Sequence, residues 1–242
     1  MNVSRPNLSL QAAALLLLGA VSLTAQSSIK EAHNVEVTAR LVPPSSRAAH
    51  SNDKIPPSVI WLSPVHPETS LSVAPGNFTL LQKNKMFSPH LLVVPVGSNV
   101  AFPNADPFFH NVFSLFDGRR FDLGLYEAGS TRHVVFSREG VSYIFCNIHS
   151  EMSAVVISLA TPLYGFANAS GNFHIKDVPE GDYNLHIWIE GLKQGSLDLL
   201  TRRVTVDRDL SDLGEIHPGP PATDKHLNKF GRPYEPEKST SY

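Results

Sequence analysis

One short segment of the chain carries three side chains that bind soft metal ions. The segment Cys146-Asn147-Ile148-His149-Ser150-Glu151-Met152 places a thiol, an imidazole and a thioether within seven residues. It directly follows the apolar run Val141 to Phe145, which is typical of a β-strand. A tight loop after a strand end can turn several side chains toward one point. Cu(I) favours sulfur and Cu(II) tolerates nitrogen, so this ligand mix suits copper that cycles between its two oxidation states.

A trigonal site of two histidines and one cysteine with a weak axial methionine needs a second histidine from elsewhere in the chain. His110 is the best candidate, because it stands just before a predicted strand and is flanked by Phe108, Phe109 and Phe113. Aromatic neighbours exclude water and lower the local dielectric, which tunes a redox potential. We therefore expect His110 to be the buried ligand and His149, in the loop, to be the exit for an electron.

Other interpretations of the same residues are weaker. A lone cysteine in a strand is usually a small buried hydrophobe, and a lone histidine before a strand is usually structural. The chain has only three methionines, however, and one of them falls in the loop with the single cysteine. Structural zinc takes four cysteine or histidine ligands, and thioether is a poor ligand for it. A dinuclear copper site would need a second loop cysteine, and a multicopper oxidase would need His-x-His pairs, which do not occur.

The N-terminus and the cysteine count predict export. Residues 1–26 contain Arg5 and then an apolar run from Ala12 to Leu23, which suits a signal peptide. A membrane anchor that is never cleaved is the alternative, but the run is shorter than the roughly 20 residues that span a bilayer. Exported proteins normally pair their cysteines, so an unpaired Cys146 is either buried and inert or bound to a ligand. We expect a periplasmic or extracellular protein with no membrane span in the mature chain.

Charge and composition exclude one class of function. The chain has 242 residues, a net charge of −2 and no basic cluster with interleaved aromatic residues, which excludes nucleic-acid binding.

Short runs rich in β-branched and aromatic residues alternate with Gly, Pro and Asn, and no long helical period occurs. We predict an all-β protein with these strand-like runs: 35–42, 58–63, 78–82, 91–96, 99–103, 111–115, 133–136, 142–146, 154–159, 165–168, 173–175, 183–189 and 203–206.

Residues 78–159 resemble a small cupredoxin of the plastocyanin, pseudoazurin and amicyanin group. The resemblance rests on Phe87-Ser88-Pro89, on the run from Val94 to Asn104, on His110-Asn111-Val112 and on the short Cys-x2-His-x2-Met loop. It implies a Greek-key β-sandwich or barrel over 76–160. It also implies one type 1 (blue) copper ion with His110, Cys146 and His149 as equatorial ligands and Met152 as the axial ligand. Asn111 would tie the two ligand loops together. The family often has proline beside the loop histidine, where this chain has Ile148 and Ser150.

A second module follows. The segment from Gly165 to Trp188 is similar to the transthyretin-like repeat of carboxypeptidase regulatory domains, with the patterns Gly-x-Phe and Val-Pro-x-Gly-x-Tyr. Three or four strands alone would leave open edges and a thin core. We therefore predict a split, small transthyretin-like β-sandwich of residues 28–68 and 161–217, with Trp61 and Trp188 in its core. The tail, 218–242, is rich in Pro, Lys, Glu and Ser, and is expected to be disordered or loosely attached.

These observations predict an exported type 1 copper protein that transfers single electrons between redox partners, one of which docks near His149. An enzyme is not expected, because protein side chains fill all four coordination positions. Two alternatives remain open: a copper-carrying or copper-sequestering protein, and a β-sandwich binding module without redox function.

Overall fold

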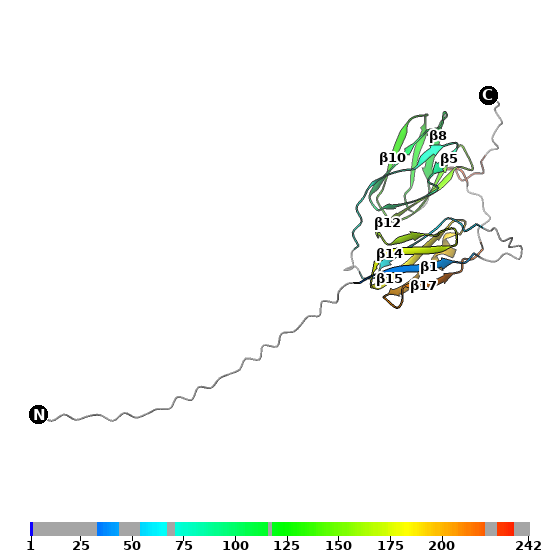
Figure 1. The fold of residues 1–242 in the computed structure, drawn as a ribbon. Coiled ribbons are helices and arrows are strands. Elements are labelled where there is room, and N and C mark those ends of the chain that lie inside the picture. The colour runs from blue at the N-terminus through cyan, green and yellow to red at the C-terminus, as the bar shows by residue number, and fades with distance from the viewer. Residues whose placement is uncertain (2–32, 44–53, 67–70, 116–117, 221–226, 235–242) are drawn as a thin grey trace. The chain divides into compact units, whose positions relative to one another are not determined.

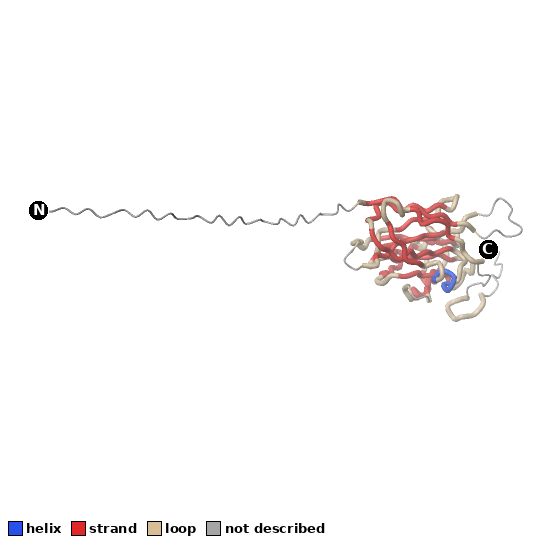
Figure 2. The backbone as a smooth tube through the Cα atoms, turned by 90° about the horizontal axis from the view of Figure 1, so that it is seen from below, coloured by secondary structure: helices blue, strands red, loops and turns tan. Residues whose placement is uncertain are grey.

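The computed structural model describes residues 1, 33–43, 54–66, 71–115, 118–220 and 227–234. The chain divides into two units, Met1–Glu31 and Ala32–Tyr242, and every described residue except Met1 belongs to the second. The predicted signal peptide, apart from Met1, therefore lies outside the described residues. Strands make up most of the described chain and the helix is a single short turn (Figure 2), so the predicted all-β class is confirmed. No helix among these residues is long and apolar enough to cross a bilayer.

The first sandwich contains strands β3 to β12 (Figure 1). Its larger sheet has the order β6-β12-β11-β8-β9, formed by Leu91–Pro95, Ser153–Leu159, Gly140–Cys146, His110–Ser114 and Phe121–Tyr126. Its smaller sheet has the order β10-β7-β3, formed by Thr131–Phe136, Ser98–Pro103 and Asn77–Thr79. A hairpin completes it, formed by β4 (Leu81–Lys83) and β5 (Met86–Ser88).

The pattern of buried side chains along the strands shows where the core of the first sandwich lies. In β7, every second residue from Ser98 to Phe102 is fully buried, as expected for a strand with one face on a core. In β12, by contrast, residues 154–159 are all buried. Ala154 and Val156 belong to the core of the first sandwich, whereas Val155 and Ile157 pack with the second. The larger sheet is thus covered on both faces along this strand.

The second sandwich joins segments from the two ends of the chain. One sheet has the order β14-β1-β17, formed by Asn172–Pro179, Asn34–Leu41 and Asp212–Ile216. The other has the order β13-β2-β15-β16, formed by Tyr164–Phe166, Ser58–Pro64, Gly181–Ile189 and Arg202–Val206. The helix α1 (Gln194–Asp198) lies between β15 and β16 in the chain. The early strands β1 and β2 pair with the late strands β14, β17, β13 and β15.

Of the two tryptophans, Trp188 connects the two sandwiches and Trp61 packs within the second. Trp188 of β15 is 1% exposed, and its indole N–H donates a hydrogen bond to the hydroxyl of Tyr143 in β11 at 3.1 Å. Trp61 is only partly buried and stacks on His186, with ring centroids 5.2 Å apart. The buried indole of Trp188 therefore finds the polar partner that it needs on the neighbouring sandwich.

Part of the C-terminal tail, for which we predicted disorder or loose attachment, is described in the structure. Residues 227–234 make hydrogen bonds to the loops at one end of the first sandwich, including one from Tyr234 to Cys146 and one from Lys229 to Asn147. Composition favoured disorder because the tail has little to bury, but polar bonds rather than apolar burial attach this segment. Residues 221–226 and 235–242 lie outside the described part of the chain.

Candidate metal centre

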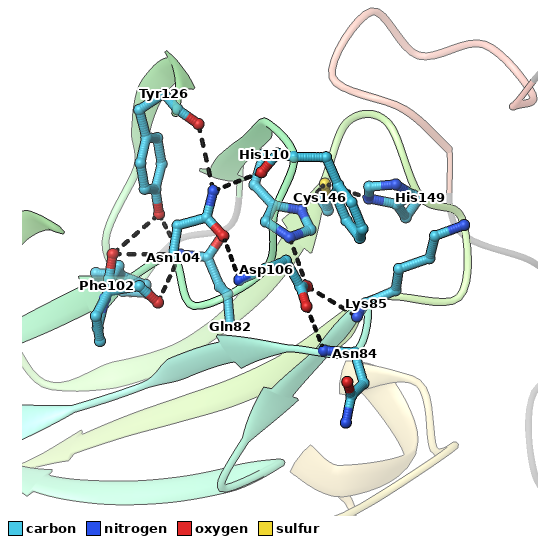
Figure 3. A network of polar contacts seen from close by, with 12 residues as sticks. Gln82, Asn84, Lys85, Phe102, Asn104, Asp106, His110, Tyr126, Cys146 and His149 are labelled. Atoms are coloured by element: carbon cyan, nitrogen blue, oxygen red, sulfur yellow. Dashed lines mark hydrogen bonds and ion pairs between the residues drawn. The ribbon is translucent and has the colours of Figure 1, made fainter. Parts of the chain in front are cut away.

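Three predicted ligands lie together at one end of the first sandwich (Figure 3). His110 begins β8, Cys146 ends β11, and His149 lies in the loop that joins β11 to β12. The antiparallel pairing of β8 with β11 sets Cys146 opposite Val112, two residues from His110. One ligand atom from each of the three side chains lies within 4.8 Å of the others, and all three residues are buried.

The spacing of these atoms fits a shared first-row metal ion. The Sγ of Cys146 lies 3.6 Å from Nδ1 of His110 and 3.5 Å from Nδ1 of His149. Metal ions of this kind bind sulfur and nitrogen at about 2.0–2.3 Å. With a sulfur–metal–nitrogen angle of roughly 110° to 120°, the sulfur and nitrogen atoms lie about 3.5–3.8 Å apart. The chemistry and the spacing of the donors therefore both fit the ion that the sequence predicts.

Met152 lies in the same buried cluster as Cys146 and is 0% exposed. Its backbone closes the ligand loop, because its carbonyl accepts the N–H of Cys146 at 3.1 Å and its own N–H donates to the carbonyl of His149 at 3.1 Å. The Cys-x2-His-x2-Met spacing thus produces a tight loop whose ends meet. The side chain of Met152 is buried in the same apolar core as Cys146, and its role as a ligand stays a prediction.

The surroundings of Cys146 favour the thiolate. Burial by itself raises the pKa of this thiol. Hydrogen bonds with the rings of His110 and His149, and from the backbone N–H groups of Asn111 and Ile148, outweigh burial and lower the pKa to about 5. A thiolate is the form of cysteine that binds metals.

Asp106 orients His110. Asp106 was not identified from the sequence as a partner of this ligand. Its Oδ2 accepts a hydrogen bond from Nε2 of His110 at 2.9 Å, so Nδ1 is the nitrogen that faces Cys146. Two backbone N–H groups in the β4–β5 turn, those of Asn84 and Lys85, donate to the same carboxylate at 2.6 and 3.0 Å. Burial opposes ionisation of Asp106, but these donors and His110 keep its pKa below the usual range. The sequence feature that could have indicated this bond is an acidic residue four positions before His110 in a largely apolar loop.

Asn104 fixes the loop that carries Asp106. Its side-chain oxygen accepts the N–H of Asp106 at 3.0 Å, and its amide nitrogen donates to the carbonyl of Phe108 at 2.8 Å. The network continues to Tyr126, whose hydroxyl donates to the carbonyl of Phe102 at 3.1 Å and receives a hydrogen bond from Gln82 (Figure 3). The first ligand loop is therefore held by buried polar groups as well as by packing.

Aromatic side chains surround the histidines differently from the sequence prediction. Phe108 contacts both rings, with centroids 5.4 Å from His110 and 5.5 Å from His149. Phe109, expected to wrap His110, is instead 52% exposed. The predicted order of exposure for the two ligands holds, since His110 is 0% and His149 is 9% exposed. The neighbouring Ile148 is 44% exposed, so one apolar side chain lies at the surface beside His149.

Asn111 joins the two ligand loops, but through its backbone. Its carbonyl accepts the N–H of Asn147 at 2.9 Å. Its side-chain amide donates instead to Oδ1 of Asp122 in β9 at 2.7 Å. Asp122 also receives the ammonium group of Lys229 at 2.8 Å. Burial raises the pKa of Asp122, but Lys229, Asn111 and the N–H of Gly124 together bring it below the usual range.

Two tail residues that the sequence did not single out reach the same end of the sandwich. The hydroxyl of Tyr234 donates to the carbonyl of Cys146 at 3.0 Å, and the N–H of Lys229 donates to the side-chain oxygen of Asn147 at 3.1 Å. Burial and the nearby Cys146 thiolate raise the pKa of Tyr234 to about 12, so its hydroxyl stays a donor. No spacing rule in the sequence connects these residues with the ligand loop.

No protein-family model and no curated protein matches the chain. Among solved structures, it is similar to a purple cupredoxin from Nitrosopumilus maritimus, with 26% identity over 34% of this chain and 98% of that chain, at a TM-score of 0.31. A reduced amicyanin variant is 18% identical over 41% of this chain and 98% of that chain, at a TM-score of 0.33. A copper-containing nitrite reductase from Thermus scotoductus is 20% identical over 49% of this chain, at a TM-score of 0.34, and the match spans only 28% of its length.

Proposed function

We propose that this protein holds one type 1 copper ion and passes single electrons. The observation that carries the proposal is the convergence of three buried residues, His110, Cys146 and His149, with sulfur–nitrogen separations of 3.6 and 3.5 Å. Copper, when bound, would supply a one-electron couple. His110, Cys146 and His149 would hold the ion, with Met152 as the proposed fourth ligand.

The residues around these ligands act by keeping their arrangement fixed. Asp106 keeps Nδ1 of His110 turned toward the cysteine, and the loop bonds of Met152 keep His149 and Cys146 close. Phe108 packs on both imidazole rings, which helps to exclude water from them. A site that changes little between two oxidation states suits rapid electron transfer, because little reorganisation accompanies the charge change.

We further propose that the electron enters or leaves at His149, where a redox partner docks. His149 is the more exposed of the two histidines, and the exposed side chain of Ile148 beside it offers an apolar contact. A small apolar interface suits a transient partner that must release quickly. We do not propose an enzymatic reaction, because four protein ligands would leave no position for a substrate.

The second sandwich has a supporting role in this proposal. We infer that it is a transthyretin-like module, as the pattern from Gly165 to Trp188 suggests. The turn between β14 and β15 and the burial of Phe173, Tyr183 and Leu185 support that assignment. Its contact through Trp188 covers the outer face of the sheet that carries Cys146. Export to the periplasm or the exterior follows from the apolar N-terminal run and the single cysteine.

The visible spectrum and the copper content of the purified protein test the proposed function. We expect one copper ion per chain, an intense thiolate-to-copper band and reversible one-electron cycling. Cys146→Ser should remove the band, and His149→Gln should weaken or shift it, whereas the exposed control His133→Gln should leave it unchanged. Exchangeable Cu(I) binding without the band would favour a copper carrier, and no copper uptake would refute both roles.

A further inference from the structure

The C-terminal segment Leu227–Tyr234, which we call the strap, bonds to the loop that carries Cys146, His149 and Met152 and to strand β9, which pairs with the strand that begins at His110. The hydroxyl of Tyr234 donates to the carbonyl of Cys146, and the N–H of Lys229 donates to the side chain of Asn147. The ammonium group of Lys229 bonds to Asp122, which in turn holds the side chain of Asn111, next to His110. These bonds connect residues 82, 88 and 107 positions apart in the chain.

The strap has a defined shape of its own. The side-chain oxygen of Asn228 accepts the N–H groups of Phe230 and Arg232 at 3.0 and 3.1 Å. The backbone of Asn228 also exchanges hydrogen bonds with Gly231 and Arg232, both at 2.9 Å. Gly231 adopts a φ of +70°, which is in the region that favours glycine. The turn fixes the segment from which Lys229 and Tyr234 reach the ligand loop and β9.

We propose that the strap is a positioning element of the metal centre, with Tyr234 and Lys229 as its positioning residues. This inference rests on the proposed function, because it concerns the same loop. One loop of seven residues supplies Cys146, His149 and Met152, so opening it would displace three ligands at once. The strap restrains the N-terminal end of that loop from outside the first sandwich.

The sequence of the ligand loop suggests that the loop itself is weakly restrained, so bonds from the strap should affect how often it opens. Ile148 and Ser150 flank His149, and neither fixes its own backbone as a proline would. The loop's internal backbone bonds are those between Cys146, His149 and Met152, each at 3.1 Å. The strap adds one bond to a backbone carbonyl and one to a side chain at the start of the loop, and a charged bond to the neighbouring strand. Its loss should make opening more frequent without changing the ligands.

Hydrogen exchange of the copper-free, full-length protein is the first test. Removing one hydrogen bond should raise the exchange rates of loop amides 146–152 by about 3- to 10-fold in Tyr234→Phe, and similarly in Lys229→Met. Lys229→Arg keeps a cation that can bond to Asp122 and should restore most of the protection. The controls Tyr164→Phe and Lys176→Met change the same residue types in the second sandwich and should leave the loop rates unchanged.

Copper release and the visible spectrum are the second test. We expect the two strap variants to lose copper to an excess of chelator about 3- to 10-fold faster than the unchanged protein. Tyr234→Phe should also alter the relative intensity of the thiolate-to-copper bands, which a remote structural change would not affect. If the unchanged protein binds copper with a blue band and both variants match the controls in all readouts, the strap is not a positioning element. If the unchanged protein shows no band, the proposed function fails, and the hydrogen-exchange result still decides whether the strap restrains the loop.

Discussion

Asp106 accepts the Nε2 proton of His110 at 2.9 Å, and both residues are almost completely buried. Since a carboxylate can only accept, this bond determines which ring nitrogen of His110 is available to a metal. The carboxylate is in turn held by the N–H groups of Asn84 and Lys85, both of which have positive φ angles near 55°. The β4–β5 turn thus helps to set the orientation of a ligand in another strand.

Replacing Asp106 with Asn should weaken Cu(II) binding by about 10- to 100-fold, as is typical when a partner of a ligating histidine is changed. The neutral amide no longer stabilises the positive charge of the site, so the reduction potential should rise. Competition titrations and potentiometry measure the two effects. Asp209→Asn, an exposed change of equal charge in the second sandwich, is the control. An unchanged affinity in Asp106→Asn would show that packing alone orients His110.

If the proposed function holds, replacing Met152 with Leu should leave copper bound and raise the reduction potential, because the thioether that would help to stabilise Cu(II) is lost. Leucine has a similar volume, so the buried site should lose less than about 1.5 kcal/mol of stability. Met86→Leu is a matched control, since Met86 is 59% exposed at the β4–β5 hairpin. A potential that does not move in Met152→Leu would remove Met152 from the ligand set.

The contact between His90 and Glu190 should make stability depend on pH. The two ring nitrogens of His90 face the carbonyl of Ser153 and the carboxylate of Glu190, both of which only accept, so the protonated ring satisfies both. The bond to Glu190 is the largest cause that raises the pKa of His90 above 6.5. A raised pKa means that the stabilisation is fully present below about pH 6.5 and is lost as the pH rises through the folded-state value.

Glu190→Gln should therefore destabilise the protein at pH 6 and have a smaller effect at pH 9. The side chains are 39% and 40% exposed, so the difference should not exceed about 1 kcal/mol. Denaturant unfolding at the two pH values measures it. Glu215→Gln removes an exposed partner of His217 and serves as the control. A larger loss at pH 9 than at pH 6 would contradict the assignment of a protonated His90.

The second sandwich depends on one close backbone approach. A Cβ atom at Gly165 would lie 2.4 Å from the carbonyl oxygen of His174, so β13 can lie this close to β14 only with glycine there. We expect Gly165→Ala to destabilise the protein by roughly 1–3 kcal/mol, the usual cost of overpacking. Gly195→Ala is the control, because nothing lies within 4 Å of its added Cβ. Thermal unfolding followed by circular dichroism would compare them, and equal midpoints would contradict the expectation.

Some strands were not recognisable from the sequence. Strand β9 was missed because Asp122 and Gly124 interrupt its apolar pattern, and Gly124 has a φ of +68°. Strand β17, from Asp212 to Ile216, was missed because only its last residue is fully buried. Both are edge strands of their sheets, where one side of the backbone has no neighbouring strand to impose a regular pattern.

The sequence by itself determined the all-β class and the candidate ligands. Turn residues divide the chain into short strands, and Cys146, His149 and Met152 are close in space because they are close in the chain. Only the tertiary structure decided what holds them. Asp106 stands only four positions before His110, but the loop conformation decides whether the two side chains meet, and Tyr234 meets Cys146 across 88 residues. Local spacing is encoded in short-range geometry, whereas these supporting bonds depend on how distant segments pack, which no short stretch of sequence specifies.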